Sequence, residues 1–373
     1  MKYFFPFFKF HQNLHYFDSA ATTIKPHVVI DAMTIAYTKY TMPIGKSVYK
    51  EAEKYYEKLV IPLKLKLKHI FYAQNYEIFF GHSVTILLSQ IIILCIEKIV
   101  KNNKKIKVLF PETVHNSFII PLQKYNNIKM HQYNESNFKE FLNTDEFDII
   151  YLPTIDHITG KEFQDYDLLE YKKKHSKVII IADASQSVMY QNEDLSNQLF
   201  DFFVFSSHKM YGPEGLAILF LSKKFMKEQD YVFSQLTLFN LRNFFSQGSL
   251  PYTAFYGFVV ALKFLEQHIY TNHEYKKQQS LLLSQIYEQI KQNSNLILLS
   301  PSNTKTIITF YHKNKHAHDI AIAFSSNDIC VRSGDLCSPF IQTENNNGFV
   351  RISMGCYVEK NDIEKIKKAI LQI

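Results

Sequence analysis

Short apolar runs alternate with longer stretches of helical length over the first two thirds of the chain. Four runs have the length and composition of strands that are buried on both faces of a parallel sheet. They are "EIFF" at 77–80, "KVLF" at 107–110, "FDIIYLP" at 147–153 and "KVIIIAD" at 177–183. Segments of helical length, such as 84–101 and 165–175, lie between these runs. This alternation predicts an α/β fold with helices on both faces of the sheet.

The pattern changes after residue 250. Just before that point, "FDFFVFSS" and "LAILFLS" predict a further pair of strands around a polar loop. Beyond it, 252–270 and 276–293 have the apolar periodicity of long amphipathic helices. Shorter strands and a closing helix at 359–373 then predict a smaller α+β domain.

Composition and charge narrow the class of protein. The 373 residues are 46% hydrophobic and 21% charged, which is typical of a globular chain with two or three domains. The net charge of +7 is modest, and its densest segment, "KNNKKIK" at 101–107, is typical of a solvated loop rather than a nucleic-acid surface. We therefore expect no nucleic-acid partner.

The sequence gives no sign of membrane insertion or secretion. The most apolar run, 86–96, is shorter than the roughly 18 residues that a spanning helix needs. The N-terminal "MKYFFPFFKF" contains a proline and lacks a small-residue cleavage site. Four cysteines stand without a CxxC pair or zinc spacing, which predicts free thiols in a reducing cytoplasm and no metal site.

Candidate chemistry gathers where one apolar run ends. In "FFVFSSHKMYGPEG", a run of strand length leads into Ser206, His208 and Lys209, while Asp183 closes the preceding strand. Neighbouring strand ends would bring this lysine and this acid to one crevice. A lysine to link with an aldehyde, an acid for a pyridinium nitrogen and polar donors for a phosphate are what pyridoxal 5′-phosphate requires. A carboxylate at a strand end is also a common helix N-cap, and the residues alone leave that alternative open.

Seven segments in collinear order make the chain resemble the class V, fold-type I aminotransferases, and within them the SufS-like cysteine desulfurases. They are "YFDSAATTIKP" at 16–26, "PETVHNSFIIP" at 111–121, "IADASQS" at 181–187, "SSHKMYGPEG" at 206–215, "QGSLP" at 247–251, "VRSGDLCSP" at 331–339 and "FVRISMGCY" at 349–357. The resemblance implies a large domain at 15–265 with a mixed, mostly parallel seven-stranded sheet. It also implies a small α+β domain formed by 1–14 and 266–373.

The resemblance also implies a set of cofactor contacts. Lys209 would hold the pyridoxal phosphate, and Asp183 would pair with its ring nitrogen. His115 would stack on the ring. The other implied contacts are Gln186 and His157 near the ring hydroxyl, Ser206, His208, His82 and Ser83 at the phosphate, and Ser249 at the phosphate of a partner subunit.

The resemblance further implies that catalysis uses the thiol of Cys337. His115 would accept a proton, and Lys209 would take the proton from the substrate's Cα. Arg351 is of the type that grips a substrate carboxylate bidentately, and Ala21 falls in the substrate-side N-terminal segment. Because an ordinary thiol is mostly protonated at neutral pH, Cys337 needs help with deprotonation.

The chain departs from the family pattern at four places. Asp335-Leu336 stands where relatives have a histidine pair before the cysteine, and His157 stands where they have an asparagine. Gly81, His82 and Ser83 replace a Gly-Thr-Thr-Glu phosphate loop, and "MPIGKS" at 42–47 replaces a His-Arg-Gly pattern.

The function that the resemblance implies is that of a homodimeric cysteine desulfurase. It would convert L-cysteine to L-alanine and leave a persulfide on Cys337 for an iron–sulfur scaffold or a sulfur-relay protein. The short loop from Gly334 to Ile341 resembles the group that relies on a dedicated sulfur acceptor. Two alternatives remain open: a selenocysteine lyase or another class V enzyme on the same fold, and a degenerate relative that binds without catalysis.

Overall fold

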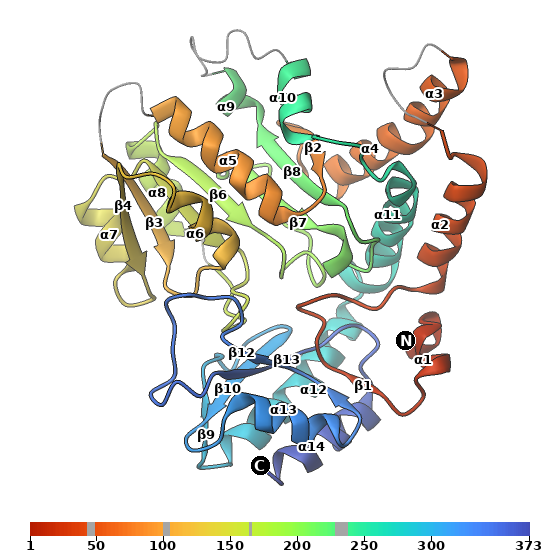
Figure 1. The fold of residues 1–373 in the computed structure, drawn as a ribbon, viewed down its shortest axis with the longest axis vertical. Coiled ribbons are helices and arrows are strands. Elements are labelled where there is room, and N and C mark those ends of the chain that lie inside the picture. The colour runs from red at the N-terminus through yellow and green to blue at the C-terminus, as the bar shows by residue number, and fades with distance from the viewer. Residues whose placement is uncertain (43–48, 100–104, 164–165, 228–237) are drawn as a thin grey trace.

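The computed structural model describes residues 1–42, 49–99, 105–163, 166–227 and 238–373. Most of "MPIGKS" and of the basic segment 101–107 therefore lies outside the described residues. Figure 1 shows a large part built on one broad sheet and a smaller part that lies beyond the ends of the strands of that sheet.

The large part contains a seven-stranded sheet in the order β2-β8-β7-β6-β5-β3-β4. The strands are β2 (Tyr76–Gly81), β3 (Ile106–Pro111), β4 (Ile128–Tyr133), β5 (Ile149–Pro153), β6 (Ile179–Asp183), β7 (Phe202–Ser206) and β8 (Ala217–Ser222). Strand β8 runs antiparallel to both of its neighbours, whereas the other pairs are parallel. The predicted α/β fold with a mixed, mostly parallel sheet is confirmed, but the prediction that 77–80 forms a parallel strand is wrong, because β2 lies at the edge and pairs antiparallel with β8.

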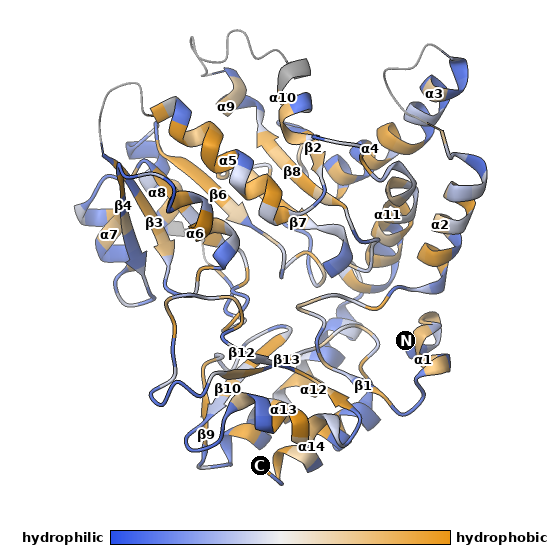
Figure 2. Cartoon of the chain, viewed as in Figure 1, coloured by the Kyte–Doolittle hydropathy of each residue, from blue (hydrophilic) through white to orange (hydrophobic). Residues whose placement is uncertain are grey.

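The central strands are apolar because both of their faces are covered. Along β6, Ile179 and Ile181 pack into one hydrophobic cluster, whereas Ile180 and Ala182 pack into the cluster on the opposite face. Full burial of a side chain of this size contributes about 1.5–3 kcal/mol, so both faces stabilise the sheet. Edge strand β4, "IKMHQY", has no such apolar run, which is why the sequence pattern did not reveal it. Figure 2 shows the contrast, with β6 and β8 in the hydrophobic colour and β4 in the hydrophilic one.

Helices cover the two faces of the large sheet. On one face, α5 (Val84–Ile99) supplies Leu87, Leu88, Ile91 and Ile92 to the cluster, beside α6 (Asn116–Leu122) and α10 (Leu238–Phe245). On the other face, α11 (Tyr252–Leu265) packs against α2 (His27–Lys39) and α4 (Ile61–Ile70). The remaining elements of the large part are α3 (Lys50–Tyr55), η2 (Tyr56–Val60), α7 (Phe138–Thr144), α8 (Tyr166–Lys174), η4 (Ser207–Lys209) and α9 (Lys223–Lys227).

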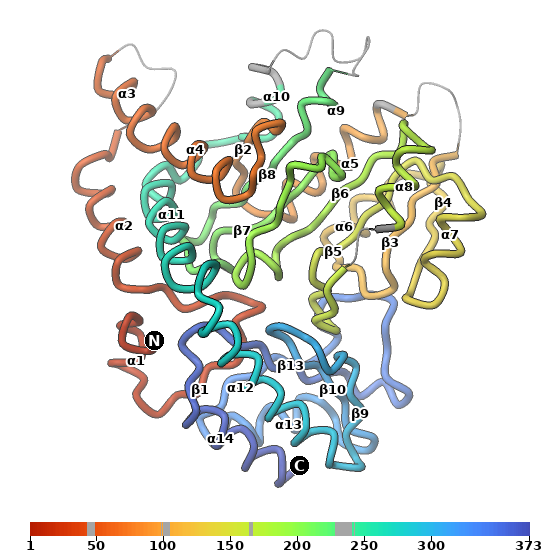
Figure 3. Tube along the Cα trace, turned by 180° about the vertical axis from the view of Figure 1, so that it is seen from behind, coloured from red at the N-terminus to blue at the C-terminus, as the bar shows by residue number. Residues whose placement is uncertain are grey.

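The small part contains a four-stranded antiparallel sheet in the order β12-β13-β10-β9. Its strands are β9 (Leu296–Leu298), β10 (Ile307–His312), β12 (Arg332–Gly334) and β13 (Phe349–Ser353). The chain enters it from α11 through η5 (Glu266–Tyr270) and α12 (His273–Lys291), and continues through α13 (Ala317–Ser325) to α14 (Lys360–Ile370). Helices α12 and α14 lie side by side, as the view from behind shows (Figure 3).

The N-terminal segment belongs spatially to the small part. It contains η1 (Lys2–Phe4), α1 (Phe7–Phe10) and β1 (His15–Tyr16), and β1 pairs in parallel with β11 (Ile329–Cys330). Lys2 Nζ lies 3.0 Å from a carboxylate oxygen of Asp362 in α14. The exact domain boundaries at 14/15 and 265/266 stay a prediction.

Within the described ranges, no helix is long and apolar enough to cross a membrane.

Candidate active site

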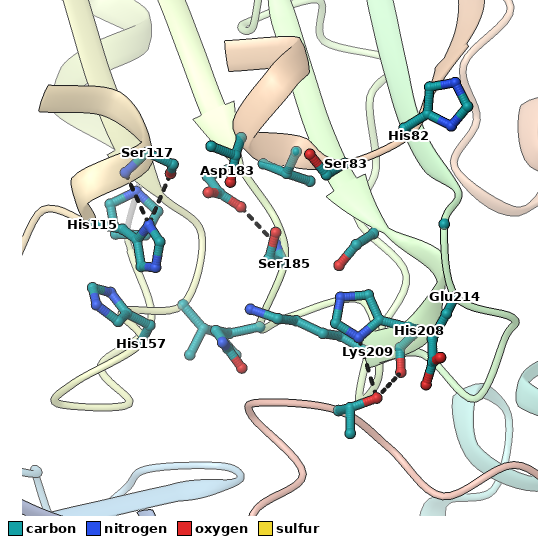
Figure 4. Close-up of a pocket in the computed structure, with 18 of the residues that line it drawn as sticks. His82, Ser83, His115, Ser117, His157, Asp183, Ser185, His208, Lys209 and Glu214 are labelled. Carbon is teal, nitrogen blue, oxygen red and sulfur yellow. Dashed lines mark hydrogen bonds between the residues drawn. The ribbon is translucent and has the colours of Figure 1, made fainter. Parts of the chain in front are cut away.

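A cavity of about 420 Å³ lies where the carboxyl ends of β5, β6 and β7 meet the polar loops of the large part (Figure 4). It brings together most of the residues that the sequence singled out for a cofactor. These are His82, Ser83, His115, His157, Asp183, Gln186, Ser206, His208 and Lys209. Cys337, Arg351, Ser249 and Ala21 are not among the residues that line it.

Asp183 is fixed by the sheet itself. It is the last residue of β6 and lies opposite Val204 of β7, two positions before β7 ends at Ser206. Its carboxylate accepts hydrogen bonds from the backbone N–H of Ser185 at 2.9 Å and from the hydroxyl of Tyr151 at 3.2 Å. The chain then continues as a turn rather than a helix, so Asp183 is not a helix N-cap. The carboxylate is left facing the cavity.

Lys209 extends into the middle of the cavity from the η4 turn that follows β7 (Figure 4). Within the described part of the chain, its amine has no hydrogen-bond or ion-pair partner. Burial lowers the pKa of Lys209 to about 8, and the nearby Asp183 charge only partly opposes that shift. A neutral, nucleophilic amine is therefore well populated just above neutral pH.

His208 precedes this lysine and is itself uncharged at neutral pH. Burial, followed by the charges of Lys209 and Lys25, lowers the pKa of His208 to about 4. Its Nδ1 lies 3.2 Å from the hydroxyl of Thr22, which also lines the cavity. The two side chains give this wall of the cavity hydrogen-bonding groups without an added charge.

His115 caps the first turn of α6 with its ring. Nδ1 accepts the backbone N–H of Ser117 at 3.1 Å, so in the neutral imidazole the proton sits on Nε2. Burial and then the charge of Lys209 lower the pKa of His115. The ring meets that of His157 edge to face, with centroids 5.2 Å apart. His115 thus offers an N–H donor, rather than a bare nitrogen, on the side away from α6.

His157 follows β5 and is buried. Its Nε2 lies 3.2 Å from the carbonyl oxygen of Leu336, and because a carbonyl only accepts, Nε2 carries the proton. Burial, with the charges of His115 and Arg351 next, lowers the pKa of His157 well below its ordinary value. The nitrogen that remains for a cofactor is Nδ1, an acceptor. At the implied place near the ring hydroxyl, His157 could donate a hydrogen bond from Nε2 only if Nε2 left Leu336.

Cys337 reaches the site from the small part, in the turn that follows β12. Its side chain is exposed, and its carbonyl oxygen accepts the backbone N–H of Asn116 at 2.9 Å, one residue after His115. Burial lowers the pKa values of Lys209 and Arg351, and a nearby Cys337 thiolate would partly oppose both shifts. The thiol loop is therefore attached at the rim of the cavity, on its His115 side.

Arg351 comes from the middle of β13 and is only 5% exposed. Its Nη1 donates to the carbonyl oxygen of His157 at 3.0 Å, and Nη2 lies 3.6 Å from the Asp18 carboxylate. The same carboxylate accepts Arg332 Nη2 at 2.7 Å. The Asp18 and Arg332 side chains were missed by sequence reasoning, although both lie inside the motifs quoted for the resemblance.

Two predicted residues lie at the margin. Ser249 is exposed, but its loop approaches the cavity through Gln247, whose carbonyl oxygen lies 3.1 Å from His82 Nε2. Ala21 is half-buried beside Ala20, whose carbonyl oxygen accepts the side-chain amide of Gln186 at 3.0 Å. Glu214 and Tyr151 also line the cavity and had not been singled out.

Unsatisfied polar atoms test whether these residues suit pyridoxal phosphate. Gln186 Oε1, which lines the cavity, is buried without a hydrogen-bond partner among the described residues, and so is Nε of Arg351, which lies outside the cavity lining. The amine of Lys209 is likewise without a partner among the described residues, and its side chain extends from the His208 side of the cavity toward His157, on one side of which lie Asp183 and Ser83 (Figure 4). Buried polar groups are normally paired, so such a set indicates a polar ligand. This cofactor needs an acid for its ring nitrogen, a free lysine for its attachment, and hydroxyl and imidazole groups for its phosphate. The cavity offers all three.

Comparison with known proteins agrees with this fit. A model of the aminotransferase class-V family matches residues 15–366. A probable cysteine desulfurase from Ureaplasma parvum is 27% identical over 99% of this chain and 96% of its own length. One from Mycoplasma genitalium is 26% identical over 98% of this chain and 93% of its own.

Solved structures show the same fold. An apo cysteine desulfurase from Thermococcus onnurineus aligns with a TM-score of 0.82 and 20% identity over 98% of this chain and 95% of that one. The cysteine desulfurase CsdA from Escherichia coli, with an S-sulfonic acid, aligns with a TM-score of 0.76 and 18% identity over 100% and 96% of the two chains.

Proposed function

The chain belongs to the aminotransferase class-V family, and from that premise we propose that it is a pyridoxal 5′-phosphate-dependent cysteine desulfurase. The reaction would take sulfur from L-cysteine, release L-alanine and leave a persulfide on Cys337. One observation carries the proposal: the free amine of Lys209 and the acid of Asp183 face one cavity, and the Cys337 loop is hydrogen-bonded to its rim.

The cofactor, when bound, supplies an electron sink that stabilises negative charge at the substrate's Cα. Lys209 would hold it, and Asp183 would keep the ring nitrogen protonated. Gln186 Oε1 and the side chains of Ser83, Ser206 and His208 are available as its polar contacts. His82 and, from a second copy of the chain, Ser249 would complete the phosphate end.

Arg351 would bind the carboxylate of cysteine. Its guanidinium is buried and carries an unpaired Nε, while Asp18 holds Nη2 only loosely at 3.6 Å. A planar guanidinium suits two parallel hydrogen bonds to a carboxylate. Ala21, next to the backbone turn that Asp18 begins, would shape the substrate side.

Lys209 would also move the proton from the substrate's Cα, because an amine with a pKa of about 8 is both a usable base and a usable acid near neutral pH. The thiolate of Cys337 would then form a bond to the substrate's sulfur while the substrate's carbon–sulfur bond breaks. The product carbon takes up a proton, so cysteine and the enzyme thiol become alanine and the enzyme persulfide.

His115 is proposed as the acid–base group beside this step. With Nδ1 occupied by Ser117, its Nε2–H faces outward in the neutral ring. To accept the Cys337 proton at Nε2, the ring would first have to carry its own proton on Nδ1, and Nδ1 would then no longer accept the Ser117 N–H. An exposed Cys337 could then pass its sulfur to an iron–sulfur scaffold or relay protein, in the reducing cytoplasm that four free cysteines suit.

The test is to incubate the cofactor-loaded protein with L-cysteine and map the extra sulfur by mass spectrometry. Sulfur on Cys337, with alanine formed in step, supports the proposal. Sulfur on Cys330 or Cys356 alone would overturn the assignment. A Cys337→Ala variant that keeps cleaving selenocysteine but not cysteine would instead favour a selenocysteine lyase. Failure of the wild-type protein to take up the cofactor would favour a degenerate relative.

A further inference from the structure

The loop that carries Cys337 has an unusual backbone. Leu336 and Cys337 have φ angles of 53° and 62°, and Gly334 just before them has a φ of 115°. Side chains with a Cβ rarely occupy this left-handed region, and they do so only where the surroundings fix the conformation. Two such residues in succession, the second bearing the candidate nucleophile, require specific contacts to hold them.

Hydrogen bonds from the large part hold the two carbonyl groups of this strained segment. Leu336 O accepts His157 Nε2–H at 3.2 Å, and Cys337 O accepts the Asn116 backbone N–H at 2.9 Å. Within the loop, the Cys337 backbone N–H donates to Asp335 Oδ1 at 3.1 Å. The backbone on both sides of the thiol-bearing Cα is thus fixed.

Packing reinforces the hydrogen bonds. The Leu336 side chain is 6% exposed and forms a small separate cluster with Ile158 and Phe349. Ile158 is the residue after His157, and Phe349 pairs with Gly334 across β12 and β13. The same short stretch after β5 therefore contacts Leu336 through both its backbone oxygen and its side chain.

Asp335 and Leu336 belong to the Cys337 loop, and His157 contacts this loop from the large part. We propose that His157, Asp335 and Leu336 form a single latch that fixes the Cys337 loop against the rim of the cavity. His157 is then a positioning residue for the thiol. The role of the thiol rests on the proposed function, whereas the latch itself rests only on these contacts.

The latch also reaches the candidate substrate arginine. The carbonyl oxygen of His157 accepts Arg351 Nη1–H at 3.0 Å, so one residue holds the thiol loop with its ring and the arginine with its backbone. Loss of the ring donor should free the loop and leave the arginine in place. The expected kinetic consequence is a fall in kcat for desulfuration with little change in KM for cysteine.

The experiment compares His157→Phe, which keeps a ring but removes the donor, with His157→Gln, whose amide N–H can replace Nε2–H. Hydrogen exchange of the Asn116 and Cys337 amides is measured in the cofactor-loaded proteins, together with kcat and KM. We expect faster exchange and a loss of up to about 10²-fold in kcat for His157→Phe, the scale for a misplaced reacting group. Both should be restored in His157→Gln.

Two further variants keep the test decisive. Asp335 is exposed and does not line the cavity, so Asp335→Ala should accelerate Cys337 amide exchange even if His157→Phe fails to fold or loses its cofactor. His131→Phe, the same change at a half-buried histidine on β4, is the matched control and should leave both amides unaffected.

Unchanged exchange in both His157→Phe and Asp335→Ala would overturn the latch. Faster exchange that His157→Gln does not restore would show that ring packing, and not the N–H donor, holds the loop, which also overturns the assignment. These amide readouts stand even if no persulfide forms on the wild-type protein, so failure of the latch and failure of the proposed function are distinguishable.

Discussion

The Lys209 side of the site and the Cys337 side are held in different ways. Asp183 and the β7 strand before Lys209 belong to a ladder of strands whose side chains are buried on both faces. Cys337 stands in a turn of left-handed residues, each costing about 1–2 kcal/mol, that is held by a few hydrogen bonds to another part of the chain. The comparison teaches that the core fixes the position of Asp183 and Lys209, whereas the position of Cys337 depends on individual contacts.

Replacing Lys209 with alanine should have the largest effect, because it removes the proposed attachment of the cofactor and the proposed proton carrier together. We expect the lysine-linked visible absorbance to disappear and desulfuration to fall by more than the roughly 10²–10⁴-fold that proton transfer alone supplies. Absorbance spectra and alanine formation measure the two effects. If the variant kept the absorbance, and reduction linked the cofactor to another lysine, the attachment site would not be Lys209.

Cys337→Ala should separate the two sides most cleanly. Because Cys337 lies outside the cavity lining, we expect cofactor binding and spectrum to match the wild-type protein while alanine formation from cysteine is lost. A titration with pyridoxal phosphate, run beside the activity assay, measures both. A weakened cofactor spectrum would mean that the two sides are coupled and that the contrast between them is wrong.

The pH dependence of reductive labelling at Lys209 tests whether burial lowers the pKa of this lysine. Burial lowers the pKa of Lys209 from 10.5 to about 8, so the folded protein exposes a reactive neutral amine at a pH where ordinary lysines are still charged. We expect the rate of reductive labelling of cofactor-free protein by pyridoxal phosphate to rise with pH and level off above about 8 at Lys209. The labelling rates of exposed lysines in the same digest should keep rising above that pH. A pH midpoint for Lys209 labelling close to that of the exposed lysines would contradict the lowered pKa.

The lowered pKa of Lys209 also determines how the stability of the protein changes with pH. Between about pH 8 and 10.5 the unfolded chain holds a proton that the folded Lys209 does not. Stability of the cofactor-free protein should therefore rise over that window relative to a Lys209→Met variant, and below it Lys209 should be destabilising by a constant amount. Denaturant titrations of the two proteins at several pH values measure the difference.

The smallest expected effect is on the free energy of unfolding, when either of two side chains that accept a backbone N–H is removed. Ser83 Oγ accepts Ile86 N–H at 3.2 Å at the start of α5, and Asp335 Oδ1 accepts Cys337 N–H at 3.1 Å in the thiol loop. Ser83→Ala should lower the free energy of unfolding by about 1 kcal/mol, as for other helix caps. Asp335→Ala should change it by less than about 0.5 kcal/mol, because the loop opens locally. Equal losses would mean that the loop unfolds with the core.

The same contrast explains what the sequence could predict. The strands around Asp183 and Lys209 were predictable because burial on both faces leaves a continuous apolar run, and strand ends converge at one edge. Edge strand β4 was missed because its exposed positions are polar. The thiol loop escaped local reasoning, since the contacts of Leu336 with His157 join residues that are 179 positions apart. Nothing in either local segment marks that pairing.

Strand β1, at His15–Tyr16, pairs with β11 at Ile329–Cys330, and Asp18 bridges to Ser353 of β13. Residues 15–18 must therefore wait until residues 329–353 have been synthesised before these pairings can form. All strands of the large sheet, and Lys209 with them, are synthesised earlier. During synthesis the pocket around Lys209 can thus assemble first, and a chain released before residue 353 would carry that pocket while its Cys337 loop lacked β13 as a neighbour.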